Sequence, residues 1–129
     1  MKQHSIRALA VTVALLAIVV TGCMPTPEGG LRPFTYADSE AAIHQAFDPL
    51  GPAVVAQASA VARCESGLWP YSGINKKNPY YRGIFQLGEH ILAINNYGGQ
   101  YYDPFQNAAA ARDLYVSRGY NWSAWACQP

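Results

Sequence analysis

The sequence predicts a small, mainly α-helical domain with at most a short β-hairpin. Two segments, residues 52–64 and 104–118, repeat apolar residues at helical spacing, and each begins with a proline and is soon followed by a glycine. Proline at the first helical position and glycine after the last are typical helix boundaries. Between these segments, residues 67–82 show no periodicity, and the apolar run bracketed by Gly83 and Gly88 is brief, so the sequence allows at most a small pair of strands.

The N-terminus carries a predicted export signal, residues 1–22. Lys2 and Arg7 precede an uncharged apolar run over residues 8–20, which is too short to span a membrane comfortably. The run ends in Val-Thr-Gly-Cys, which resembles a bacterial lipobox, where the cysteine is acylated and becomes the first residue of the mature protein. Cys23 is therefore the expected lipidation site. The alternative is an ordinary signal peptide in which Cys23 is incidental.

The rest of the chain divides into a tether and one domain. Residues 23–37 have the composition of a flexible tether, and residues 38–129 have the length of a single domain. After the signal, seven basic residues minus eight acidic residues gives a net charge of −1. No basic stripe suggests nucleic acid as a partner, and we expect a monomer.

The first half of the domain is predicted to hold two helices. Asp38 and Ser39 supply an N-cap signal for a short helix over residues 40–47. The second helix, residues 52–64, is rich in alanine and is expected to be central. Residues 67–82 then form a long loop with several aromatic rings, a kind of segment that is often functional.

The second half is predicted to hold a short helix over residues 89–95 and a longer one near the C-terminus. Asp103 is the expected cap of the longer helix, with proline at the first helical position and Gln106 at the third. Tyr115 is expected on the inward face of this helix, as a core residue. Asn121 caps a final short turn that holds two tryptophans.

The cysteine count predicts a disulfide. The chain has three cysteines, and an odd number in an exported protein leaves one to explain. If Cys23 carries lipid, Cys64 and Cys127 remain as a pair in an oxidising compartment, where a disulfide is the expected state. Two separate buried thiols are the alternative.

Glu65 is the candidate catalytic residue. It lies on the last turn of the second predicted helix, where the partial negative charge of the helix end disfavours an acid with a purely structural role. Leu68 and Trp69 follow it closely, so we consider it a candidate proton donor. The alternative is an ordinary exposed glutamate that closes a helix.

Four motifs together resemble those of a known enzyme family. They are Glu-Ser at a helix end, Gly-Ile-Phe-Gln-Leu after a loop, Asp-Pro-Phe-Gln-Asn-Ala-Ala-Ala-Ala ahead of an aromatic residue, and two tryptophans near the end. In this order and at this spacing they resemble the lysozyme-like transglycosylase family, which includes soluble lytic transglycosylases, goose-type lysozymes and resuscitation-promoting factors. The resemblance covers residues 48–127 and implies a small lysozyme-like fold.

The resemblance also implies site residues. Glu65 matches the catalytic acid, and Ser66, Phe85, Gln86 and Asn107 match residues of the family's motifs and are expected to bind substrate. Trp69, Tyr81 and Tyr97 are expected to bind it as well, because aromatic rings in the loops around the motif suit a sugar cleft. Two departures from the family pattern are Ala111, where glycine is usual, and Leu114-Tyr115, where the tyrosine is displaced by one position.

Cleavage of a β-1,4 glycosidic bond needs a proton donor, and a hydrolase normally adds a second carboxylate. Asp103, Asp113 and Glu89 each have a structural interpretation, whereas a lytic transglycosylase needs one acid. The expected function is therefore cleavage of the MurNAc–GlcNAc linkage of peptidoglycan glycan strands with a 1,6-anhydro product. The alternatives are a lysozyme-type hydrolase and a non-catalytic, lipid-anchored wall-binding or immunity module.

No cofactor or metal is expected, because the histidines and cysteines lack the spacing of a zinc site. The lipid on Cys23 would make the membrane a second partner and would hold the exported protein in the cell envelope, facing the wall.

Overall fold

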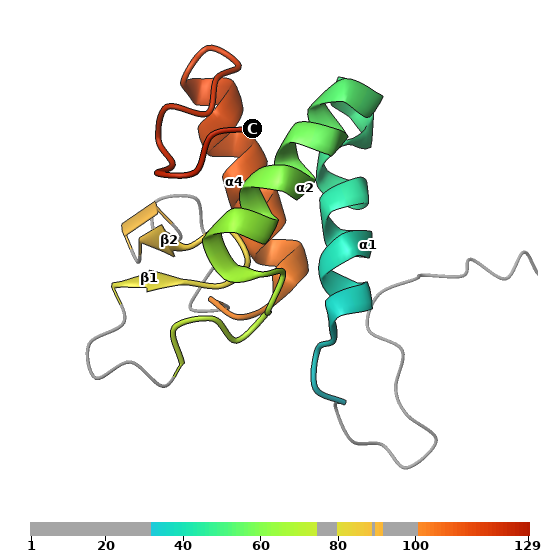
Figure 1. Cartoon of the computed structure of the whole chain (residues 1–129), viewed down its shortest axis with the longest axis vertical. Helices are drawn as coiled ribbons and strands as arrows, with labels where there is room; N and C mark the ends of the chain where they lie inside the picture. The colour runs from blue at the N-terminus through green and yellow to red at the C-terminus, as the bar shows by residue number, and fades with distance from the viewer. Residues whose placement is uncertain (1–31, 75–79, 89, 92–100) are drawn as a thin grey trace, which may run out of the picture. The chain divides into compact units, whose positions relative to one another are not determined.

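The structure is a computed structural model that describes residues 32–74, 80–88, 90–91 and 101–129, and residues 33–129 form one compact unit. Within the described residues the elements follow the order α1, a 3₁₀ turn, α2, β1, β2 and α4 (Figure 1). This arrangement confirms the predicted class, mainly α with a short β-hairpin. Cys23 and Tyr97 lie outside the described residues, as do most of the predicted helix 89–95 and residues 23–31 of the predicted tether.

Helix α1, Tyr36–Phe47, begins four residues earlier than the sequence predicted. Its N-cap is Thr35, whose side chain accepts a hydrogen bond from the Asp38 backbone N–H, while the Asp38 carboxylate accepts one from the Thr35 N–H at 2.7 Å. Asp38 and Ser39 were predicted to precede the helix. They lie inside it because Asp38 serves as the third-residue acid of a capping box, a position more often held by glutamate.

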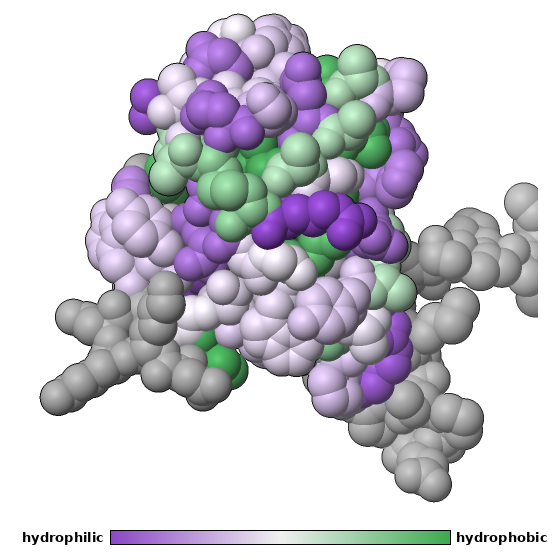
Figure 2. Space-filling view, in the orientation of Figure 1, coloured by the Kyte–Doolittle hydropathy of each residue, from purple (hydrophilic) through white to green (hydrophobic). Residues whose placement is uncertain are grey.

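Helix α2, Pro52–Ser66, follows a short 3₁₀ turn, Asp48–Leu50, and buries Val55, Ala58, Val61 and Ala62. It is not the central helix, because α1 is the helix that packs against both α2 and α4. The outward residues of α2 include Ala53, Ala56 and Ala60, which are exposed. A pale green, moderately hydrophobic band crosses this face of the molecule in Figure 2. As a result, α2 covers the core from one side only.

Helix α4, Pro104–Ser117, is capped as predicted by Asp103, whose carboxylate accepts hydrogen bonds from the backbone N–H groups of Phe105 and Gln106. Its buried face includes Tyr115, confirmed as a core residue at 5 % exposure. Among the described residues, no helix combines the length and the apolar character that a membrane crossing requires.

Aromatic rings from four segments fill the core between the helices and the C-terminal segment. The Trp122 ring lies 4.5 Å from that of Tyr115 and 5.7 Å from that of Phe47, measured between centroids. Trp125 lies 5.1 Å from Trp122 and donates its indole N–H to the Phe85 carbonyl oxygen at 3.0 Å. The C-terminal tryptophans are therefore core residues that close one side of the domain.

The hairpin consists of β1, Tyr81–Arg82, and β2, Leu87–Gly88, paired antiparallel. Ile84 and Phe85 in its turn are fully buried, so the turn points into the core. The hairpin therefore faces the helices with its turn and leaves Tyr81 exposed.

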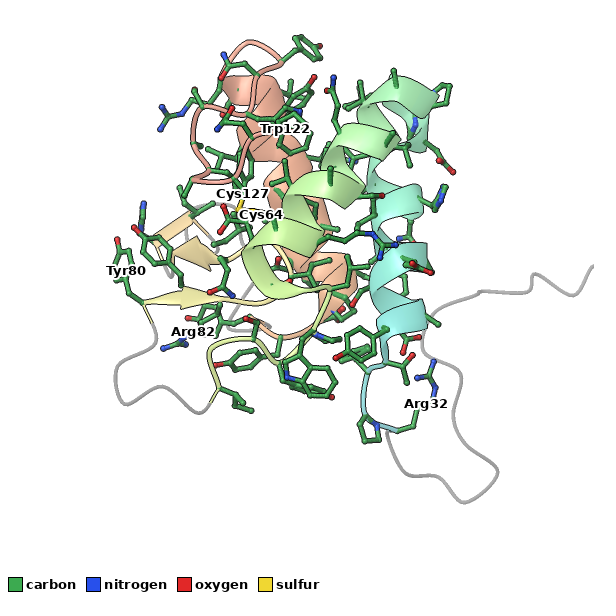
Figure 3. All side chains as sticks on the ribbon, in the orientation of Figure 1. Arg32, Cys64, Tyr80, Arg82, Trp122 and Cys127 are labelled. Carbon is green, nitrogen blue, oxygen red and sulfur yellow. A yellow bond between two sulfur atoms is a disulfide. The ribbon has the colours of Figure 1, made fainter. Side chains whose placement is uncertain are left out.

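The disulfide predicted between Cys64 and Cys127 is present, with a Cα–Cα distance of 5.9 Å (Figure 3). It joins the last turn of α2 to the C-terminal segment across 63 residues of chain. Gln128 adds two hydrogen bonds from its side-chain amide to the Trp122 and Trp125 carbonyl oxygens. The C-terminal segment is thus attached to the domain covalently and by hydrogen bonds.

Replacing both Cys64 and Cys127 with serine is expected to lower the free energy of unfolding by about 2–4 kcal/mol, because the unfolded chain is no longer constrained by the closed loop. Chemical denaturation of the variant and of the wild-type protein, each with and without a reducing agent, measures the change. The reducing agent should destabilise the wild type and leave the double variant unaffected. Equal stability of the oxidised wild type and the variant would contradict a stabilising role for the bridge.

Candidate active site

Glu65 lies on the last turn of α2, as predicted, one residue beyond the disulfide. The helix ends because Gly67 adopts a left-handed conformation, with a φ of 63°, and donates its N–H to the Arg63 carbonyl oxygen. The Glu65 side chain is half-buried, and its Oε1 accepts a hydrogen bond from the Cys127 backbone N–H at 3.0 Å. The described residues give Oε2 no hydrogen-bond partner. One carboxylate oxygen is therefore anchored, and the other is available to a ligand.

The carboxylate opens into a cleft of about 470 Å³, a volume within the usual range for ligand sites. The cleft is lined by the end of α2, the hairpin and the C-terminal segment: Glu65, Tyr81, Gln86, Ala124, Trp125 and Ala126. It therefore combines one acid, one amide and two aromatic side chains.

Gln86 is the amide of this cleft and ends the hairpin turn. Its backbone has a φ of 46°, a left-handed conformation that is uncommon for a residue with a side chain. Its Nε2 donates to the Gly83 carbonyl oxygen at 2.8 Å, which holds the side chain in place. The described residues donate no hydrogen bond to its Oε1, so this oxygen can accept one from a ligand N–H or O–H.

Ser66 braces the site rather than facing it. Its hydroxyl oxygen lies 3.0 Å from the Ala62 carbonyl oxygen and 2.8 Å from that of Ile84, so the hydroxyl can donate to either. The bond to Ile84 ties the end of α2 to the hairpin turn. The interpretation of Ser66 as a substrate-binding residue is replaced by this structural one, because main-chain carbonyls engage its only donor.

Asn107 and Phe85 were also predicted to bind substrate, but both are fully buried. Asn107 Oδ1 accepts a hydrogen bond from the Phe85 N–H at 2.9 Å, and its Nδ2 lies 3.1 Å from the Arg82 carbonyl oxygen and 3.3 Å from that of Tyr101. A Cβ at Gly83 would lie 2.3 Å from this Nδ2, so only glycine fits beside the amide. Asn107 therefore positions the hairpin, and Phe85 packs beneath it.

Trp69 is exposed, as expected of a sugar-binding ring, but it does not line the Glu65 cleft. Its ring lies 5.4 Å from those of Tyr36 and Tyr71, and Tyr71 lies 6.2 Å from Tyr102. These four residues form a separate aromatic cluster near the start of α1. Tyr81, by contrast, is exposed and lies in the wall of the Glu65 cleft.

The sequence interpretation missed the C-terminal wall of the cleft, Ala124, Trp125 and Ala126. A signal for it was present, because a disulfide from Cys64 to Cys127 brings the residues just before Cys127 close to Glu65.

Other carboxylates are engaged elsewhere. Asp103 caps α4, and Asp113 lies 2.8 Å from the Arg112 guanidinium. Glu89, the third acid weighed from the sequence, lies outside the described residues. Among the described residues that line the cleft, Glu65 is the only acid.

No protein-family model, curated protein or solved structure matches this chain.

Asn107→Ala is expected to lower the free energy of unfolding by about 2–4 kcal/mol, because it removes the buried hydrogen bond from the Phe85 N–H and those to the Arg82 and Tyr101 carbonyl oxygens. Ser117→Ala on the same helix removes an exposed hydrogen bond and is expected to change stability by less than about 0.5 kcal/mol. Urea denaturation of both variants measures the difference. If Asn107→Ala is as stable as Ser117→Ala, the buried amide does not hold the hairpin.

Proposed function

We propose that this protein is a lytic transglycosylase that cleaves the β-1,4 MurNAc–GlcNAc linkage of peptidoglycan, with Glu65 as general acid and then general base. The main support is one half-buried carboxylate, anchored through Oε1 by the Cys127 N–H, in an open cleft flanked by Tyr81 and Trp125. A catalytic acid needs this combination of a fixed position and a free oxygen.

The reaction uses the two states of the Glu65 carboxyl group in turn. The protonated group gives its proton to the glycosidic oxygen as the bond from that oxygen to C1 of the muramoyl residue breaks. The resulting carboxylate then takes the proton of the same residue's C6 hydroxyl as O6 bonds to C1. The product is a 1,6-anhydro ring, no water is consumed, and Glu65 returns to its starting state.

The carboxylate count favours this route over hydrolysis. A glycoside hydrolase uses two carboxyl groups about 5–9.5 Å apart. The described residues that line the cleft supply one, and Asp103 and Asp113 are engaged elsewhere. A lysozyme-type hydrolase remains the alternative, with Glu89 as its candidate second acid, and the experiment below separates the two reactions.

The neutral side chains of the cleft suit a glycan. The aromatic rings of Tyr81 and Trp125 offer flat apolar faces to the C–H faces of pyranose rings. Gln86 Oε1 is positioned to accept a hydrogen bond from an N-acetyl N–H or a sugar hydroxyl. Together these groups would orient a strand so that one linkage lies beside Glu65.

The proposal includes the location of the protein. A lipid on Cys23 would anchor a monomer in the cell envelope, and the chain between Cys23 and the compact unit that begins at residue 33 would let the domain reach nearby glycan strands. Peptidoglycan and the membrane are then its two partners, and neither cofactor nor metal takes part.

Glu65→Gln is expected to lower the cleavage rate by at least about 10²-fold, because the amide cannot donate the proton. Mass spectrometry of fragments released from purified peptidoglycan measures both rate and product. The wild-type protein should release fragments lighter than hydrolysis products by one water molecule. Glu40→Gln is the matched control, because Glu40 pairs with Arg63 on the surface. This variant should retain full activity.

Hydrated fragments, lost in both Glu65→Gln and Glu89→Gln, would mean a two-carboxylate hydrolase. If the folded wild-type protein releases no fragments, the enzyme proposal is wrong, and binding of the wall without cleavage becomes the leading explanation.

A further inference from the structure

A second hollow, of about 210 Å³, continues the cleft beyond Glu65. The two share four lining residues, Tyr81, Gln86, Ala124 and Trp125, so they form one groove. The far part is lined by residues that do not touch the first hollow: Gly88, His90, Ile91, Leu114 and Arg118. The volume of this second hollow is below the usual range for a separate ligand. It suits a substituent of the ligand that occupies the main cleft.

Arg118 gives this hollow its charge. It is the C-cap of α4 and is exposed, and the described residues offer its guanidinium no ion pair. Two other arginines of the domain are paired, Arg63 with Glu40 and Arg112 with Asp113, each at 2.8 Å. A cation suits a helix C-terminus in general. That effect alone does not account for its position in the wall of a groove that starts at the candidate catalytic acid.

The rest of the far wall is neutral or apolar. Among the residues that the structure describes there, none is acidic. The His90 Nδ1 lies 2.9 Å from the Tyr80 hydroxyl oxygen, so this nitrogen is already engaged. Ile91 and Leu114 supply aliphatic surface beside the guanidinium. The hollow therefore presents one cation next to apolar groups, which suits a small carboxylate that carries a methyl group.

We propose that Arg118 and this hollow bind a carboxylate on the lactyl arm of a muramoyl residue. The inference depends on the proposed function, because it takes peptidoglycan as the ligand. The lactyl arm projects from C3 of the sugar, and it ends either in its own carboxylate or in an amide-linked peptide stem that bears carboxylates. Both present the same chemistry to a guanidinium, which binds carboxylates through two parallel hydrogen bonds. The methyl group of the arm or of the first stem residue lies against Ile91 and Leu114.

This contact would assign a direction to the strand in the groove. With the lactyl arm in the Arg118 hollow, its sugar lies over the shared residues Tyr81 and Trp125, and the linkage to be cleaved lies next to Glu65. A neutral glycan without the lactyl carboxylate would lose this orientation. The hollow would thus act as a specificity site for muramoyl sugars.

The test measures binding separately from cleavage. The full chain carrying Glu65→Gln is titrated with three soluble glycan preparations: strands with peptide stems, strands freed of stems by an amidase, and the stem-free strands after conversion of the lactyl carboxylates to methylamides. Adding Arg118→Gln is expected to weaken binding about tenfold for the ligands that carry the recognised carboxylate, as for other hydrogen bonds to charged groups. Binding of the methylamide strands should be unchanged.

Arg63→Gln in the same background is the control, because it removes the same charge from a surface ion pair outside both hollows. A loss confined to stem-bearing strands identifies a stem carboxylate, and a loss confined to stem-free strands identifies the lactyl carboxylate. A loss with both kinds of strand means that the hollow accepts either carboxylate. An equal effect of Arg118→Gln and Arg63→Gln, or an equal effect of Arg118→Gln on all three glycans, would overturn the proposal.

The outcome is distinguishable from failure of the proposed function. If the Glu65→Gln protein binds the strands and discriminates among them through Arg118, the inference stands even where the wild-type protein cleaves nothing. If the wild-type protein cleaves all three glycans and Arg118→Gln has no selective effect, the enzyme proposal stands and the inference fails.

Discussion

The site depends on the side-chain amide of Asn107, which is fully buried and contacts three backbone groups. Its oxygen accepts from Phe85, and its nitrogen lies within hydrogen-bond distance of the Arg82 and Tyr101 carbonyl oxygens. Unpaired polar groups at this depth would each be costly, so the geometry of the amide determines where the hairpin turn meets α4. The hairpin turn presents Gln86 to the cleft and the Ile84 carbonyl oxygen to the Ser66 hydroxyl. The fully buried Asn107 therefore determines the shape of an open site.

A second constraint acts on the carboxylate. Glu65 lies where the partial charge of the α2 C-terminus is unfavourable for an acid. The Cys127 N–H offsets this unfavourable charge by donating a hydrogen bond to Glu65 Oε1. The disulfide between Cys64 and Cys127 keeps that N–H in place. The same segment brings Trp125 into the cleft wall while its indole N–H bonds to Phe85. One short C-terminal segment therefore completes the core and the site together.

Arg118 and Glu65 lie on the walls of one groove, and their charges are opposite. Such an arrangement suits a ligand with an acceptor oxygen at one point and a carboxylate at another, separated by a sugar that packs on aromatic rings. Neither residue is neutralised by a described neighbour. Under the proposed function, the groove would combine proton transfer at Glu65 with charge recognition at Arg118.

The sequence alone determined helices α2 and α4, because the proline, aspartate and glycine that mark their ends act on residues a few positions away. It also determined the cysteine pair, because that prediction needs only the number of cysteines. It also placed Glu65 on a helix end and Tyr115 in the core. The start of α1 was wrong because Asp38 can cap from inside a helix as well as from before it. Only the tertiary structure decided that Asn107, Phe85 and Ser66 support the site from behind, and that Trp125 and Arg118 border it. Motif residues share a sequence pattern whether they face a ligand or the core, and which way they face depends on packing between segments far apart in the chain.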